Sequence, residues 1–390
     1  MRYLRTLSTR SVVFVVVAIA AIAIGGAAIA VAATGGRHET PPPKPLANAL
    51  HDALSAPEPA GITARIKFTN NLFPSGALLG NIASALMSGA SGRLWLTNDG
   101  RGRIELQSNA GDVQVVWNEK QLTAYDAFSN TVYRIQLPAA EPKASGADQP
   151  PTLAEISTFL DKLAQHADIS GARPDNVAGR PAYTVSVSPK HDGGLLGQAQ
   201  LAWDAVQGKP LRAAIYAHGV SQPVLELKAT EIAFGPVASA DVDVSPPAGT
   251  KVVDLTPPAT LGPKSGGSKP VTGLDAVRAA AGFPVTAPDT LVGLPLREAR
   301  LVGGTDSHVA LLLYGQGLGG IVVAERKADA SAAKGGPLES LPKVSLDGVT
   351  GHELATELGT ALQWERGGVA YVLAGSLPPS AAEAAARSLG

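Results

Sequence analysis

The chain of 390 residues contains no cysteine, few aromatic residues (5%) and almost no net charge. Without cysteine it can form no disulfide, thiolate metal site, thiol nucleophile or lipid-modified N-terminal Cys. A formal net charge of −1 and the lack of a long basic run give no field that would attract nucleic acid. The hydrophobic content of 45% is nevertheless enough to bury more than one core.

Catalytic and metal-binding motifs are also missing from the sequence. The seven histidines are scattered and include no H-x-H or H-x-x-x-H pair. There is no G-x-S-x-G motif, and the glycine-rich stretch 315–319 falls between two predicted strands without a following helix, which favours a turn over a phosphate loop. The sequence therefore predicts a protein that is not an enzyme and holds neither metal nor cofactor.

The N-terminus predicts a membrane segment. Arg2, Arg5 and Arg10 precede an uncharged apolar run over residues 11–33, long enough to cross the cytoplasmic membrane. The charge bias places the N-terminus inside and the body of the chain outside the cytoplasm. A cleaved signal peptide is the alternative, since residues 30–32 form a small-x-small site. Residues 1–33 are thus an anchor or a signal, and the protein would be secreted if they are removed.

The middle of the chain predicts a curved antiparallel sheet. Residues 34–45 form a Pro-rich tether, and residues 46–255 contain many short runs with the period-2 alternation of half-buried strands, as in residues 113–137. Two helices interrupt the strands, at 46–54 and 152–167, the second with Thr152 and Glu155 in a capping box. We expect an α+β protein: a membrane helix, then an unclosed antiparallel half-barrel covering one or two helices.

The C-terminal part of the chain predicts a second unit. Residues 256–272 are rich in Pro, Gly and Ser and form the best linker in the sequence. Residues 273–390 follow with helical patterns at both ends and strand patterns between them. This part is expected to be a small α+β module.

Residues 71–92 are uncharged yet too short and too rich in Gly and Ser to cross a membrane. They are compatible with a buried helix over residues 78–87, with an apolar flap over a hydrophobic cavity, or with a segment that dips into the membrane. The flap hypothesis rests on the small residues, which allow a hinge at low cost.

Two short motifs, YDAFSNTVYR at residues 125–134 and SPPAGTKV at residues 245–252, resemble the outer-membrane lipoprotein carrier (LolA-like) superfamily. The resemblance covers roughly residues 46–255 and implies a half-barrel with an apolar cavity for acyl chains and no catalytic residues. The superfamily also includes partners of anti-sigma factors. Residues 275–388, through QWERGGVAY at 363–371, more weakly resemble an uncharacterised C-terminal module of Gram-positive extracytoplasmic proteins.

The candidate ligand-binding residues follow from these patterns. Apolar side chains on strands or in the uncharged segment are candidates for the cavity wall or flap, and cationic or hydroxyl side chains near one hairpin are candidates for head-group contacts. The wall candidates are Phe68, Leu72, Phe73, Leu78, Leu79, Met87, Trp95 and Trp117, and the head-group candidates are Arg93, Arg103 and Tyr125.

The sequence thus predicts a non-catalytic extracytoplasmic protein that binds and transfers lipid or lipoprotein through a hydrophobic cavity. Its expected partners are acyl chains, the cytoplasmic membrane through residues 11–33, and a further membrane protein. The alternative is an envelope sensor or regulatory partner, of the anti-sigma-factor type, that uses the half-barrel to bind a lipid or a peptide.

Overall fold

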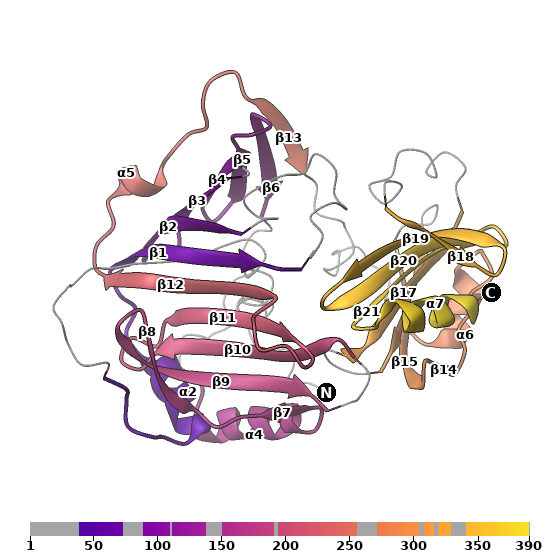
Figure 1. Ribbon diagram of the computed structural model, residues 1–390, viewed down its shortest axis with the longest axis horizontal. Coiled ribbons are helices and arrows are strands. Elements are labelled where there is room, and N and C mark those ends of the chain that lie inside the picture. The colour runs from indigo at the N-terminus through magenta and orange to yellow at the C-terminus, as the bar shows by residue number, and fades with distance from the viewer. Residues whose placement is uncertain are drawn as a thin grey trace.

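The computed structural model describes residues 39–72, 89–109, 111–137, 150–190, 194–255, 271–303, 308–315, 319–328 and 341–389. Within these ranges the protein is mostly β with few helices, arranged as two separate sheets (Figure 1). No helix in these ranges is long and apolar enough to cross a membrane. The predicted membrane segment, residues 11–33, lies outside the described residues.

The first sheet is an open, curled half-barrel. In the described part of the chain it has thirteen strands in the order β13-β6-β5-β4-β3-β2-β1-β12-β11-β10-β9-β7, with β8 also paired to β9. Its strands are β1 (Gly61–Asn70), β2 (Ala90–Thr97), β3 (Gly102–Ser108), β4 (Gly111–Trp117), β5 (Gln121–Asp126), β6 (Thr131–Gln136), β7 (Ala167–Ile169), β8 (Arg173–Val177), β9 (Arg180–Pro189), β10 (Leu196–Asp204), β11 (Pro210–Ala217), β12 (Leu225–Phe234) and β13 (Lys251–Leu255).

The half-barrel differs from a purely antiparallel sheet at one edge. Strand β13 runs parallel to β6, with Val252 opposite Val132. Parallel neighbours need a long connection, and here residues 137–250, which include β7 to β12, separate β6 from β13 in the chain. The sequence predicts β13 as a strand of an antiparallel sheet, and this direction is wrong, because side-chain alternation is the same in both orientations and does not distinguish them.

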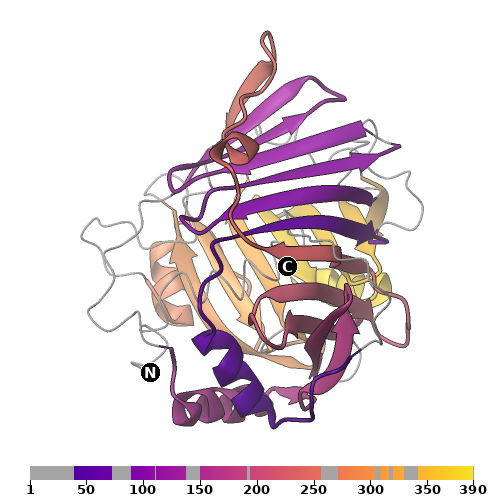
Figure 2. The same cartoon turned by 90° about the vertical axis from the view of Figure 1, so that its left-hand side faces the viewer.

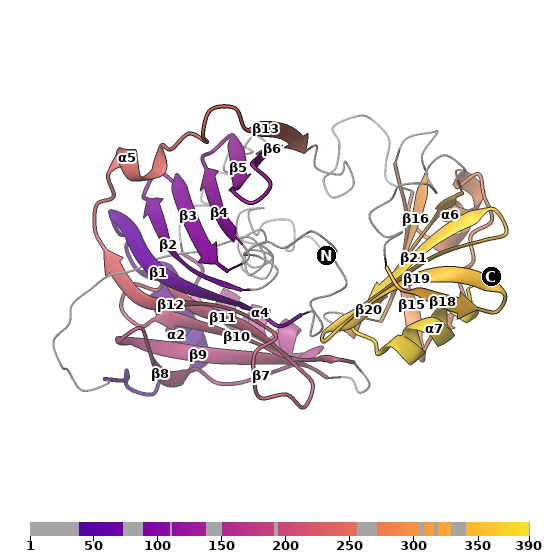
Figure 3. The ribbon, with the colours of Figure 1, turned by 45° about the horizontal axis from the view of Figure 1, so that its top comes forward.

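Helices α2 (Leu46–Ser55) and α4 (Leu153–Ala164) lie inside the curl, and the short α5 (Ser239–Val242) lies outside it (Figures 2 and 3). The predicted capping box of α4 is confirmed: Thr152 accepts from the Glu155 N–H, and the Glu155 carboxylate accepts from the Thr152 N–H. Helix α2 packs through Ala49 against Tyr183 and Trp203 on β9 and β10.

The described end of the Pro-rich tether lies against the half-barrel. The Asn176 side chain donates to the Glu39 carbonyl at 3.0 Å, and the Tyr183 hydroxyl donates to the Pro42 carbonyl at 2.7 Å. Pro41 is buried. Residues 39–45 are therefore part of the folded body. They do not belong to the free spacer that the sequence predicts over residues 34–45.

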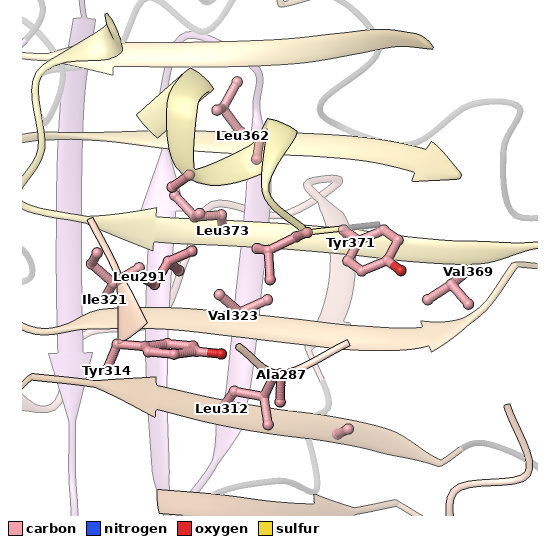
Figure 4. Packing of buried hydrophobic residues seen from close by; sticks show 14 of the residues in the cluster. Ala287, Leu291, Leu312, Tyr314, Ile321, Val323, Leu362, Val369, Tyr371 and Leu373 are labelled. Atoms are coloured by element: carbon pink, nitrogen blue, oxygen red, sulfur yellow. The ribbon is translucent and has the colours of Figure 1, made fainter. Parts of the chain in front are cut away.

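The second sheet carries its helices on one face. In the described residues its eight strands have the order β14-β15-β16-β17-β21-β20-β19-β18. The elements are α6 (Leu274–Ala280), β14 (Thr290–Leu291), β15 (Leu294–Val302), β16 (Val309–Tyr314), β17 (Ile321–Lys327), β18 (Lys343–Leu346), β19 (Val349–Thr356), β20 (Gly359–Arg366), β21 (Val369–Gly375) and α7 (Pro379–Arg387). The main core of the protein lies between this sheet and its helices (Figure 4).

A carboxyl group is buried in that core. Glu325 on β17 is fully buried; its Oε2 accepts the Thr286 N–H at 2.9 Å, whereas its Oε1 has no hydrogen-bond partner among the described residues. The neighbouring strand places Tyr371 beside it, and the Tyr371 ring stacks on Trp364 at 5.0 Å between centroids. Burial, opposed by the Thr286 hydrogen bond, raises the pKa of Glu325 to about 7.

The two sheets meet at few polar contacts in the described chain. The Glu357 N–H donates to the Leu72 carbonyl at 3.3 Å, just after β1. On the other side, Leu195 N–H donates to the Ser376 carbonyl at 3.0 Å, and Leu196 N–H donates to the Ser376 hydroxyl at 2.7 Å. The ends of β1, β10 and β21 thus join the half-barrel to the second sheet.

The turn between β14 and β15 yields a first prediction. Val292 and Gly293 form this two-residue turn with φ of 49° and 78°, and a β-branched residue tolerates positive φ poorly. Replacing Val292 by Asn should stabilise the protein by about 1 kcal/mol in urea unfolding, because Asn adopts this conformation more readily. Val220 is equally exposed (44% against 45%) and is not at positive φ, so Val220→Asn should give no such gain. Equal changes in stability on the two substitutions would show that the backbone at Val292 is not strained.

Glu325 yields a second prediction. Since its pKa is higher in the folded than in the unfolded chain, its contribution to stability is full below the unfolded value and is lost as pH rises through about 7. Glu325→Gln should therefore raise the thermal unfolding midpoint at about pH 8 and have little effect at about pH 5. Glu365→Gln, which alters an exposed carboxylate on β20, is the control. If the unfolding midpoint of Glu325→Gln depended on pH as strongly as that of the wild type, the Glu325 carboxyl would not titrate as expected.

Candidate functional site

The inner face of the half-barrel carries unbroken apolar rows. Strand register places Leu227 opposite both Phe68 and Ala213, and continues the row to Leu201 and Val185. Directly opposed residues in a sheet point to the same face. A second row runs beside the first, and we call the two together the apolar floor. It consists of Phe68, Leu227, Ala213, Leu201 and Val185, with Leu225, Ile215, Ala199 and Val187.

Most of the apolar floor is not fully buried. Its residues on β9 to β12 are half-buried, whereas Phe68 on β1 is only 5% exposed. Helix α2 covers one end of the floor at Val185 and Leu201. The remaining floor residues thus form a strip of apolar surface that is neither sealed nor fully exposed. Such partly exposed, continuous apolar surface on a concave face is typical of binding sites.

Trp117 lies on the same inner face, nearer the other end of the strands. Its partners in the register are Gly102 and Leu122. The indole ring lies directly against Gly102, where an added Cβ would be 2.1 Å from the ring. Only glycine leaves room for the ring there, so the backbone of β3 fixes the position of Trp117 on the inner face.

Four other candidates lie on the opposite, outer face. Trp95 pairs with Thr63 and Arg103, in alternation with the buried Leu94. By the same register Arg93 lies beside Trp95 on that face, and Tyr125 lies there opposite Gln114. The inner-face site described above therefore excludes Trp95, Arg93, Arg103 and Tyr125.

Arg103 already has partners on the outer face. Its guanidinium lies over the Trp95 ring, 4.9 Å from the centroid, and donates to the Asp241 carbonyl of α5 at 3.1 Å. It also forms an ion pair with Glu105. Burial lowers the pKa of Arg103 from its ordinary value. These contacts attach α5 to the back of the sheet, which is a structural role.

The remaining candidates divide between the junction and residues outside the described ranges. Leu72 lies at the junction, where its carbonyl accepts the Glu357 N–H and its own N–H donates to the Asn70 side chain at 2.9 Å. Phe73, Leu78, Leu79 and Met87 lie outside the described residues, as does the helix predicted over 78–87. Their role as wall or flap stays a prediction.

The floor on β9 to β12 is the part of the site that was not predicted from the sequence. The period-2 alternation of half-buried strands is nevertheless visible in its sequence. Every floor residue on these strands has an odd number and alternates with polar or small residues. The predicted wall residues all lie between residues 68 and 117, whereas this part of the floor comes from residues 185–227. The register between strands, which decides that four such runs face the same way, is not visible in one sequence.

Two other features were tested as sites. In the described residues no group of three or more His, Asp or Glu side chains is placed to hold a metal ion. A shallow recess of about 380 Å³ lies at the ends of β10 and β11, next to the junction. It is wide open and lined by the ends of β9 to β11 and by the loop after β11, which includes His218 and Val220. It brings no cluster of chemically active groups together.

Comparison with known proteins assigns the chain to no family. No protein-family model matches it, and no curated protein matches it. Several solved structures are similar. One is a chain of the Pseudomonas aeruginosa MucA/MucB complex, with 16% identity, a TM-score of 0.43, and coverage of 88% of this chain and 95% of that one.

Two further structures are similar to about half of the chain. An uncharacterised conserved protein from Thermus thermophilus has 12% identity and a TM-score of 0.32, with coverage of 54% of this chain and 97% of that one. A LolA superfamily protein from Nitrosomonas europaea has 7% identity and a TM-score of 0.23, covering 52% and 98%. The last belongs to the superfamily that the sequence resembles. The similarities are too distant to support an argument about function, which rests on the geometry alone.

Proposed function

We propose that the protein is a non-catalytic, extracytoplasmic binder and carrier of lipid or lipoprotein acyl chains, and that the acyl chain lies on the apolar floor. The observation that carries this proposal is the floor itself. It combines nine apolar residues from five adjacent strands, and all of those on β9 to β12 are half-buried.

The dimensions of the floor suit an acyl chain. Adjacent strands lie about 4.8 Å apart, so the row from β9 to β1 is roughly 19 Å long. Removing a methylene from water is worth ~0.8 kcal/mol, and a chain that covers the row could be held by apolar contact alone. The rows contain no charged side chain, so nothing in them opposes an uncharged hydrocarbon.

The location of the protein is part of the proposal. The apolar run over residues 11–33 would anchor it in the cytoplasmic membrane, with the half-barrel outside and close to the lipid source. Because residues 39–45 pack on β8 and β9, the reach of the half-barrel would be limited to the few residues before Glu39.

A charged residue on the floor tests this function. Leu227→Glu places a carboxylate between Phe68 and Ala213 and should weaken the binding of cis-parinaric acid, a fluorescent long-chain fatty acid, by at least about tenfold. The measurement is a fluorescence titration of the full chain. Thermal unfolding of the variant must remain cooperative for the comparison to hold.

The matched control is Thr230→Glu, which adds the same charge at an exposed position of the same strand. It should bind the probe as the wild type does. No saturable binding to the wild-type chain, or equal loss in both variants, would contradict a binding site on the floor.

The second candidate function is an envelope sensor or regulatory partner. It is favoured by the junction, because the strand that carries Phe68 continues directly into Leu72, whose carbonyl bonds to Glu357 of the second sheet. Ligand binding on the floor could thus change the position of the second sheet through a few hydrogen bonds. A membrane protein could respond to that change.

Hydrogen exchange separates the two functions. In a sensor, addition of cis-parinaric acid should change the exchange rates of the Glu357, Leu195 and Leu196 amides, which bridge the sheets. In a simple carrier, the change should be confined to the half-barrel. Unchanged bridging amides in the presence of saturating probe would remove the support for the sensor.

A further inference from the structure

The second sheet has an apolar face that its helices do not cover. Register aligns Leu313, Val322, Ala374, Ala361 and Leu354 in one row across five strands. Leu311, Ala324 and Val372 begin a second row beside it. We call these eight residues the apolar wall.

The apolar wall is partly exposed, unlike the opposite face of the same strands. Val322 is 43% and Val372 39% exposed, while their neighbours Val323 and Leu373 are fully buried in the core. A sheet with helices on one face usually carries polar residues on the other. Here the uncovered face carries eight apolar residues in its middle, and the packing of the sheet against its own helices does not explain them.

The apolar wall faces the half-barrel. In Figure 4 helix α7 lies in front of the second sheet and strands of the half-barrel lie behind it, and Figures 1 and 3 show the same order. The hydrogen bonds from Glu357 and Leu196 hold this arrangement. Both units thus present apolar sheet faces toward the same side of the junction.

The chemistry of the wall selects its occupant. Charged and polar groups border the wall on more than one side. Glu298 and Arg300 lie opposite Leu313 and Leu311. Arg326 and Glu365 share the next row with Ala370. Beyond Val372, the second row continues to Gln363, His352 and Lys343. An extended peptide needs backbone hydrogen bonds, which sheet edges provide and sheet faces do not. A hydrocarbon chain needs none, and a charged border can contact a polar head group.

We propose that the apolar wall is a second part of the lipid-binding site and contacts an acyl chain of the same bound lipid as the apolar floor. This inference rests on the proposed function. It assigns to the C-terminal unit a direct role in ligand binding, so a lipid with more than one acyl chain could be divided between the floor and the wall.

Cross-linking locates the ligand without a substitution. A fatty acid with a diazirine in its chain is bound to the full chain, activated by light, and the labelled tryptic peptides are sequenced by mass spectrometry. Labels should appear on the peptides 301–326 and 367–387, at Val322 and Val372 and not at Val323 and Leu373. Labels confined to the half-barrel would overturn the proposal.

Substitutions test the contribution of the wall to affinity. Val322→Glu and Val372→Glu should each weaken cis-parinaric acid binding by roughly tenfold. Val252→Glu is the matched control, because Val252 on β13 is 41% exposed and lies on the outer side of the half-barrel. Its affinity should not change. The thermal unfolding midpoint of each of the three variants is also measured. A midpoint equal to that of the wild type would show that the variant folds.

The outcomes separate this inference from the function on which it rests. If Leu227→Glu abolishes binding and the two wall variants bind normally, the floor is the site and the wall proposal is wrong. If the wild-type chain binds no probe, both proposals fail. Loss of affinity in both sets of variants, with Val252→Glu and Thr230→Glu unchanged, is the expected result.

Discussion

The pairing of β1 with β2 on one side and β12 on the other is the constraint on which the half-barrel depends. A shift of one residue between β1 and β12 would separate Phe68 from Leu227 and place them on opposite faces, and a shift between β1 and β2 would do the same to Phe68 and Ala90. Because the register is kept, apolar residues from both halves of the sheet meet on one inner face. The outer face is left to polar pairs such as Arg103 with Glu105.

The elements that the sequence predicts best are those with strong local signals. The capping box at Thr152 and Glu155 and the alternation in residues 113–137 both correspond to elements of the structure. The α+β class was wrong in emphasis, since the described chain is mostly β. The short edge strand β18 was missed because its four residues give too little periodicity.

The candidate site was predicted less well, for two physical reasons. Trp95 was predicted to line the cavity, yet alternation along β2 turns it to the face opposite Leu94 and the floor. Aliphatic residues such as Leu227 and Ile215 gain importance only through the register, which brings together strands that are far apart in the chain. No local pattern contains that information.

The central claim is that the inner face of the half-barrel holds lipid. Native mass spectrometry of the full chain purified from a bacterial membrane, followed by solvent extraction, tests it most directly. The account predicts a bound species that is released by extraction and identified as a molecule with at least one long acyl chain. A homogeneous unliganded mass that stays unchanged after incubation with membrane lipid extract would contradict it.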